Sequence, residues 1–137
     1  MIDMTLEIAE KAVRAAQARA RELGIPITVS VVDESGRLVL CARGNGTGFL
    51  TTDTSRGKAV AAANFRRTTK EMTEMAREHG LFWNSLSGLV PGQILPSTGG
   101  VPIAVGGRVI GAIGCGGGTG EQDHQCAQAG TDAVERA

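Results

Sequence analysis

The chain has 137 residues, and its 14 Lys and Arg side chains balance 14 Asp and Glu, which gives a formal net charge of zero. This length predicts a single domain, residues 1–137, that is large enough to bury its own core. Nucleic-acid binding needs a cationic surplus, and aromatic residues, at 3% of the chain, offer few stacking platforms for bases. No run of about 18 apolar residues is present, so the sequence also argues against a membrane span.

Cysteine usage and glycine content indicate two further properties. Cys41, Cys115 and Cys126 cannot all pair, no C-x-x-C spacing suggests zinc, and no secretory leader pattern opens the chain. We therefore expect free thiols in a reducing cytoplasm. The 20 glycines and many alanines bury little apolar area each. We expect compensation from close backbone packing and from burial of further surface in a homo-oligomer.

Hydrophobic periodicity and turn residues predict the elements in chain order. They are a helix over residues 4–23, strands over 27–33 and 37–43, a helix that follows the cap candidates at 51–53 and runs through Lys58 to Phe65, a helix between Thr68 and Gly80, strands over 99–105 and 108–115, and a helix that follows Thr119. Apolar residues recur at steps of three and four in the helices and at steps of two in the strands. Two hairpins without crossover helices favour an antiparallel sheet, so the predicted fold class is α+β.

Capping and turn residues set several boundaries. Thr68-x-x-Glu71 and Thr119-x-x-Gln122 are capping boxes, in which each side chain bonds the other residue's backbone N–H. Asp3 is a candidate N-cap of the first helix, and Gly24 is a stop signal. Gly106-Gly107 is a two-residue hairpin turn that requires positive φ.

Two segments are predicted to be irregular. Residues 44–48 form a glycine-rich loop that no packing argument requires, and the cap candidates Thr51, Thr52 and Asp53 follow it. Residues 81–96, which include the only tryptophan, are broken by glycine and proline.

The glycine-rich bend over residues 114–120 joins a strand to a helix but fits neither the dinucleotide nor the P-loop pattern. It is either an anion contact at a helix N-terminus or a structural turn. Cys115 lies just before this helix start, where a thiol pKa can fall. With His124 as a base and with Glu121 and Asp123 alongside, it would be a nucleophile. The alternative is that Cys115 is a small apolar residue and His124 is solvated surface.

Three further residues have open roles. His79 ends a helix, where a cation suits the helix dipole, and the functional alternative is a metal ligand or a haem axial ligand. Arg43 either clamps a substrate carboxylate or a haem propionate, or lies in water at a strand end. Lys58 stands in an otherwise apolar helix segment and is ambiguous for the same reason.

Short motifs occur in order along most of the chain: Val31-Val32-Asp33-x-x-Gly36, Arg43, Lys58-Ala59, Phe65-x-x-Thr68, Gly99-Gly100-Val101-Pro102-Ile103, Gly111-Ala112-Ile113-Gly114 and Gly120-Glu121-Gln122-Asp123. This ordered set resembles the GlcG/HbpS family of haem-binding or haem-degrading-like domains, which includes the C-terminal domain of PduO-type corrinoid adenosyltransferases. The resemblance implies a profilin-like fold, with a central antiparallel sheet flanked by helices. It also implies symmetric oligomers and a cytoplasmic role beside catabolic enzymes.

Two functions therefore compete. The first is a small-molecule-binding protein of the GlcG/HbpS type, with haem or another tetrapyrrole as the candidate ligand or cofactor. The second is a cofactor-independent lyase, isomerase or hydrolase acting on a small carboxylate-bearing catabolic intermediate. A third interpretation is a structural or regulatory partner domain without a ligand. The candidate residues are Cys115, Glu121 and His124 for catalysis, Arg43, Lys58, Trp83, Gly100, Gly116 and Gly117 for ligand binding, and His79 for a metal.

Overall fold

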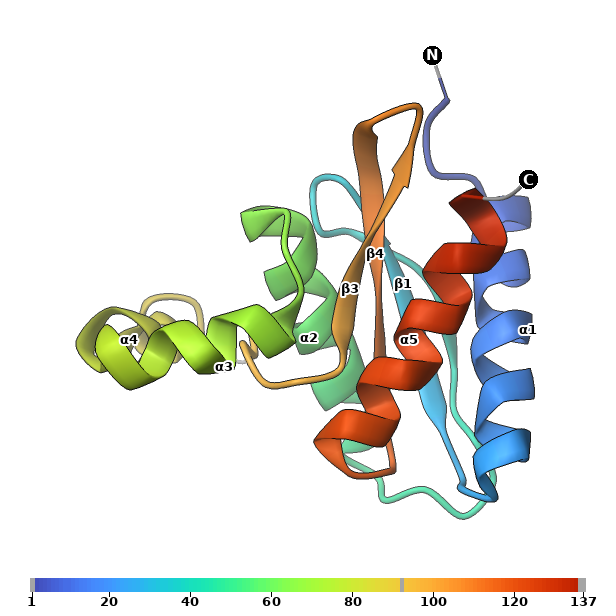
Figure 1. Ribbon diagram of the computed structural model, residues 1–137, viewed down its shortest axis with the longest axis horizontal. Coiled ribbons are helices and arrows are strands. Elements are labelled where there is room, and N and C mark those ends of the chain that lie inside the picture. Colours follow the sequence, from blue (N-terminus) through green and yellow to red (C-terminus); the bar gives the residue numbers. More distant parts are fainter. Residues whose placement is uncertain (1, 92, 136–137) are drawn as a thin grey trace.

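A four-stranded sheet with helices on both faces makes up the body of the molecule (Figure 1). The computed structural model describes residues 2–91 and 93–135. The elements are α1 (Leu6–Leu23), β1 (Thr28–Asp33), β2 (Leu38–Ala42), α2 (Thr51–Phe65), α3 (Thr69–Glu78), α4 (Gly80–Leu89), β3 (Gly100–Val105), β4 (Arg108–Gly116) and α5 (Gly120–Glu135). The strand order is β2-β1-β4-β3, and every neighbouring pair is antiparallel. The predicted α+β class and antiparallel sheet are confirmed.

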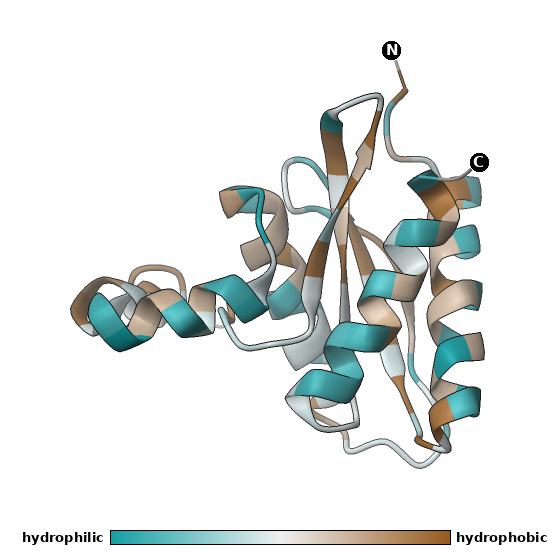
Figure 2. Ribbon diagram, viewed as in Figure 1, coloured by the Kyte–Doolittle hydropathy of each residue, from teal (hydrophilic) through white to brown (hydrophobic). Residues whose placement is uncertain are grey.

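The helices form two layers around the sheet. α1 and α5 pack against each other and on one face, whereas α2 lies against β1 and β4 on the other face. Ala9 and Ala16 of α1 are fully buried, as are Val31 and Ile113 of the two central strands. Figure 2 shows the resulting pattern, with hydrophilic residues on the outer sides of α1 and α5. Among residues 2–91 and 93–135, no helix combines the length and hydropathy that crossing a bilayer requires.

Glycine makes the contact between α2 and the sheet possible. A Cβ added at Gly114 of β4 would overlap the Ser55 carbonyl oxygen and would lie 2.7 Å from the Ala59 nitrogen, both in the backbone of α2. The helix backbone therefore lies directly on the strand backbone, as the composition predicts.

Packing and hydrogen bonds fix the loop over residues 44–48, contrary to the prediction that no packing requires it. A Cβ at Gly44 would overlap the Ile27 carbonyl oxygen, so the chain passes directly over the start of β1. The Gly44 N–H donates to Thr28 Oγ1 at 3.1 Å, and the Thr51 hydroxyl donates to the same oxygen at 2.8 Å. These bonds tie the loop and the start of α2 to the sheet.

At the N-termini of the helices, two predicted caps are wrong and two predicted capping boxes are confirmed. Thr5 caps α1 by accepting a bond from the Ile8 N–H at 3.2 Å, whereas Asp3 pairs with Arg108 at 3.0 Å. α2 begins at the first of the three predicted caps, so these side chains lie inside the helix, and its N-cap Leu50 makes no side-chain bond. Both capping boxes are present.

The prediction that residues 81–96 are irregular is wrong up to Leu89. α4 begins at Gly80, which the sequence analysis took as the end of the preceding helix. Trp83 and Leu86 bury against Met72 of α3 and pack on Phe65 of α2, and this tertiary contact stabilises a helix rich in glycine and serine. α3 and α4 together project from the body as an arm (Figure 1).

Candidate functional site

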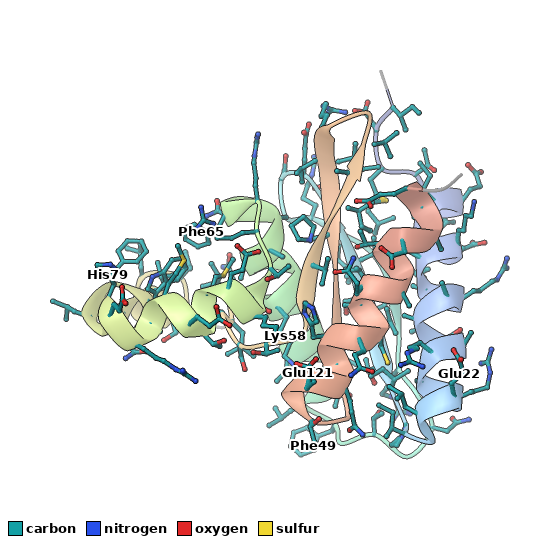
Figure 3. All side chains as sticks on the ribbon, in the orientation of Figure 1. Glu22, Phe49, Lys58, Phe65, His79 and Glu121 are labelled. Atoms are coloured by element: carbon teal, nitrogen blue, oxygen red, sulfur yellow. The ribbon has the colours of Figure 1, made fainter. Side chains whose placement is uncertain are left out.

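Lys58 and Asp123 form a buried ion pair between α2 and α5. Lys58 Nζ lies 3.0 Å from Asp123 Oδ2 and donates to the Cys115 carbonyl oxygen at 2.9 Å. The two side chains are only 8% and 4% exposed. A Cβ at Gly99 would lie 2.9 Å from Asp123 Cβ and 3.0 Å from Lys58 Cδ, so the lysine passes through space that a glycine leaves free. Figure 3 shows Lys58 where α2 and α5 approach each other.

Both carboxylate oxygens of Asp123 accept a hydrogen bond. Its Oδ1 accepts a bond from the Gly118 N–H at 2.9 Å, in the bend that precedes α5. Burial raises the pKa of Asp123 above its usual value, while the Lys58 ammonium and the Gly118 N–H act in the opposite direction. Asp123 was considered only as a neighbour of His124, and its buried ion pair with Lys58 was not predicted from the sequence. The available signal was its spacing of three from Cys126 and seven from Gly130, which places it on the buried stripe of α5.

Of the two interpretations of Cys115, the structure agrees with a small apolar core residue and contradicts a thiol with a lowered pKa. The residue is fully buried, and desolvation, with Cys126 and Asp123 nearby, raises the pKa of Cys115 well above its usual value. β4 continues to Gly116, so the thiol lies within the strand and not at the helix N-terminus. The pKa of Cys126 is likewise raised by burial, to about 11.

His124 and Glu121 belong to α5 and lie near α3 of the arm. Glu121 Oε2 is 3.0 Å from Lys70 Nζ of α3, and both side chains are about half exposed. Burial lowers the pKa of His124, and Lys70 lowers it further. Its Nδ1 atom is buried and has no hydrogen-bond partner within residues 2–91 and 93–135. Across the same residues no hydrogen bond joins His124 to Cys115.

The predicted glycines shape backbone contacts. A Cβ at Gly100 would overlap the Lys58 carbonyl oxygen, and the Gly100 N–H donates to Thr69 Oγ1 at 2.8 Å. A Cβ at Gly117, where φ is +128°, would lie 2.7 Å from the Pro26 carbonyl oxygen, and one at Gly116 would lie 3.1 Å from Thr54 Oγ1. At all three positions, the absence of a side chain therefore allows two segments of the chain to pack closely.

Arg43, His79 and Trp83 lie apart from the ion pair. Arg43 is exposed just after β2. His79 is exposed at the junction of α3 and α4, far from Lys58 on the arm (Figure 3). In the described part of the chain, no cluster of three His, Cys, Asp or Glu is arranged to hold a metal ion. Trp83 is buried in an aromatic cluster, with its ring 4.9 Å from that of Phe65.

A groove between α2, α4 and the β1–β2 turn was not predicted from the sequence. It consists of two adjoining cavities of about 340 and 410 Å³. The residues that line both are Ser35, Gly36, Val60 and Gln93. The first cavity is walled mainly by apolar side chains, namely Phe65, Leu86, Leu89, Val90 and Ile94. The second contains Arg37 and Arg56. We call the whole the α2–α4 groove.

At the cationic end of the α2–α4 groove, one of the two guanidinium groups makes no ion pair with any described residue. Arg37 is largely exposed and pairs with Asp33 at 3.0 Å. Arg56 is half-buried on α2 and makes no ion pair with any described residue. A guanidinium in this state offers several N–H donors to a carboxylate or phosphate. The groove therefore suits a molecule with an apolar body and an anionic end.

Comparison with known proteins identifies the family. The family model described as haem degrading protein HbpS-like matches residues 4–132. A Citrobacter freundii protein, the uncharacterized 15.0 kDa protein in the dhaT-dhaS intergenic region, is 36% identical over 129 residues, covering 94% of this chain and 90% of that protein.

Two solved structures are similar over nearly their whole length. Klebsiella pneumoniae protein ORFY superposes with a TM-score of 0.90 at 30% identity, covering 100% of this chain and 94% of that one. PduOC, solved as a haem complex, superposes with a TM-score of 0.86 at 26% identity, covering 96% and 95% of the two chains. These matches agree with the motifs found along the sequence. The chain belongs to the HbpS-like family.

Proposed function

We propose that the chain binds an amphipathic small molecule that carries carboxylate groups, with haem or a related tetrapyrrole as the first candidate, in the α2–α4 groove. The observation that carries the proposal is the apolar wall of the groove beside the unpaired guanidinium of Arg56. The haem complex of the related PduOC supports the choice of ligand class.

The two ends of the groove would contact different parts of the ligand. Phe65, Leu86 and Ile94 offer apolar surface against which a flat apolar body buries, at about 25 cal/mol per Å². Arg56 then forms a charge-assisted hydrogen bond with a carboxylate at the other end. Trp83 packs behind Phe65 and supports this wall without lining the groove.

The lining residues fit the periphery of a porphyrin and not its iron. Apolar side chains suit the macrocycle, and Arg56 suits a propionate. No His, Cys, Met or Tyr lines either cavity, so the described groove residues provide no side chain of the kinds that ligate haem iron. His79 and His124 both lie outside this lining. We therefore expect the groove to bind the macrocycle with or without its metal.

A titration with haemin and with iron-free protoporphyrin IX tests the proposal. Quenching of Trp83 fluorescence reports binding, because this only tryptophan packs behind the groove wall. We expect both ligands to bind with similar dissociation constants. Arg56→Gln should weaken both by about tenfold or more, because it removes a charged hydrogen bond. Arg14→Gln, on an exposed face of α1, is the matched control.

Three results would contradict this proposal. One is no binding of either ligand at stoichiometric concentrations. Another is equal behaviour of the Arg56 and Arg14 variants. The third is binding of haemin alone, with its Soret shift lost in His79→Ala or His124→Ala, which would assign the ligand to a histidine outside the groove.

The proposal favours binding over the enzyme alternative because Cys115, its candidate nucleophile, is buried with a raised pKa. We also propose a cytoplasmic location. The three free cysteines support it, since thiols persist in a reducing compartment.

A further inference from the structure

The second cavity of the α2–α4 groove is bordered by two arginines and, among the described residues that line it, by no carboxylate. Arg37 lies just after the β1–β2 turn and Arg56 lies on α2, so the two cations border a space of about 410 Å³ from different elements. The carboxylate of Glu34, which lines the first cavity, is already paired with Arg108 at 3.0 Å. The lining of the second cavity is therefore cationic.

Asp33 fixes the turn that carries Arg37. Asp33 Oδ1 accepts bonds from the Ser35 N–H at 2.9 Å and from the Arg37 N–H at 3.0 Å. Asp33 Oδ2 accepts a bond from Arg37 Nε at 3.0 Å. Within residues 2–91 and 93–135, neither terminal nitrogen of the Arg37 guanidinium makes a hydrogen bond. The side chain is thus held through Nε, and its two terminal NH₂ groups are free to donate.

The pair of Asp33 with Arg37 leaves the arginine able to bind a second anion. The Arg37 side chain is 80% exposed, and an ion pair this exposed contributes little to stability. A guanidinium carries five N–H donors, so it can bond to Asp33 through Nε and to a ligand through its terminal nitrogens. Arg37 therefore adds a second donor group to that of Arg56 at the same end of the groove.

We propose that the α2–α4 groove selects ligands whose polar end carries two negative charges, with Arg56 and Arg37 each binding part of that end. Two neighbouring carboxylates or one phosphate monoester would supply both charges, whereas a single carboxylate would leave one arginine without a partner. The inference rests on the proposed function for the apolar body of the ligand and specifies its charged end. Arg37 is then the residue that determines the preference for a doubly charged ligand.

Three naphthalene ligands separate the charge of the end from the apolar body. At pH 8, 2-naphthoate carries one charge, naphthalene-2,3-dicarboxylate carries two on neighbouring carboxylates, and 2-naphthyl phosphate carries two on one group. In isothermal titration calorimetry at low salt, we expect at least one of the dianions to bind about tenfold or more tightly than 2-naphthoate. The tighter of the two dianions identifies carboxylates or phosphate as the preferred end.

Arg37→Gln should remove most of this preference and leave the affinity for 2-naphthoate within about twofold, because Arg56 still binds a single charge. The variant should fold, since Asp33 holds the turn through backbone N–H groups that the substitution leaves in place. Arg14→Gln is the matched control. Arg14 is 78% exposed and pairs with the carboxylate four positions before it, as Arg37 does, but it lies on α1 outside the groove.

Salt dependence provides a second readout. Because Arg37 is exposed, its attraction for the second charge is screened by ions in solution. The preference for the dianions should therefore shrink between about 20 and 500 mM NaCl in the wild type and change little in Arg37→Gln. A preference that salt affects equally in both proteins would contradict the role of Arg37.

Equal binding of the singly and doubly charged naphthalenes, a preference that Arg37→Gln leaves unchanged, or no binding of any of the three would overturn the inference. A parallel titration with protoporphyrin IX separates it from the proposed function. Discrimination among the naphthalenes without porphyrin binding contradicts the tetrapyrrole assignment alone. Porphyrin binding without such discrimination overturns the present inference alone.

Discussion

Lys58 Nζ and Asp123 Oδ2 lie 3.0 Å apart in the interior, where they join the helix on one face of the sheet to a helix on the other. The pair passes Gly99, just before the start of β3, and Lys58 also donates a hydrogen bond to the carbonyl oxygen of Cys115. Three elements distant in sequence, α2, β4 and α5, thus meet at one charged contact. Because each charge compensates the other, removal of either leaves an uncompensated charge in the core.

Asp123→Asn should therefore destabilise the protein strongly. The amide retains an acceptor for the Gly118 N–H but leaves the Lys58 ammonium buried without a counter-charge, which costs about 3–5 kcal/mol. Urea unfolding followed by circular dichroism measures the loss. Asp53→Asn, at an exposed site on α2, is the control and should change the free energy of unfolding little. A loss below about 1 kcal/mol in Asp123→Asn would show that the pair contributes little net stability.

The sequence correctly predicted several caps and turns, because each of these depends only on residues that are neighbours along the chain. The capping box at Thr68, the turn at Gly106 and the helix stop at Gly24 each depend on one or two neighbouring residues, and all three are present. The pairings β1–β2 and β3–β4 followed from the two predicted hairpins, whereas the central pairing of β1 with β4 was not predicted.

The missed features depend on contacts that are distant along the chain. α4 contains glycine and serine and is stabilised by burial of Trp83 and Leu86, which no local pattern reveals. The α2–α4 groove is formed by α2, α4 and a turn, so Arg56 could not be placed in it from sequence. Arg43 was selected for its charge at a strand end and lies exposed outside both the groove and the buried ion pair.

Stability should rise with pH through the titration of His124. Burial, followed by Lys70, lowers the pKa of this imidazole from 6.5, and Glu121 and Glu71 oppose the shift. Between the lowered value and 6.5 the unfolded chain holds more protons than the folded chain, so the free energy of unfolding increases as pH rises across that window. Urea titrations at pH 5 to 8 should show a smaller rise in His124→Gln than in the wild type. Parallel curves would contradict the assignment.

The three cysteines should differ sharply in reactivity. Burial raises the pKa of Cys115 and Cys126, so at pH 7.5 both are protonated and shielded, whereas Cys41 is half-buried on the edge strand β2. Iodoacetamide should label Cys41 in the folded protein and the other two only in urea, as peptide mass spectrometry will show. Labelling of Cys115 at the rate of Cys41 would restore it as a candidate nucleophile.

Gly114→Ala should separate α2 from the sheet. The added methyl group would overlap the Ser55 carbonyl oxygen and lie 2.7 Å from the Ala59 nitrogen. Both atoms belong to helix backbone and cannot rotate away, so the helix itself must shift, at a cost of about 1–3 kcal/mol or more. Gly48→Ala is the control, because a Cβ there meets nothing within 4 Å. Chemical denaturation should show a large loss for the first variant and a small change for the second.

The same substitution should be coupled to the ion pair. Lys58 adjoins Ala59, so a shift of α2 at Gly114 also moves the ammonium away from Asp123. The losses in Gly114→Ala and Asp123→Asn should then sum to more than the loss in the double variant, because the second substitution removes a contact that the first has already weakened. A double-mutant cycle measures this interaction. Strict additivity would show that the sheet absorbs the added methyl group without moving the helix, and that the glycine contact and the ion pair stabilise the fold independently.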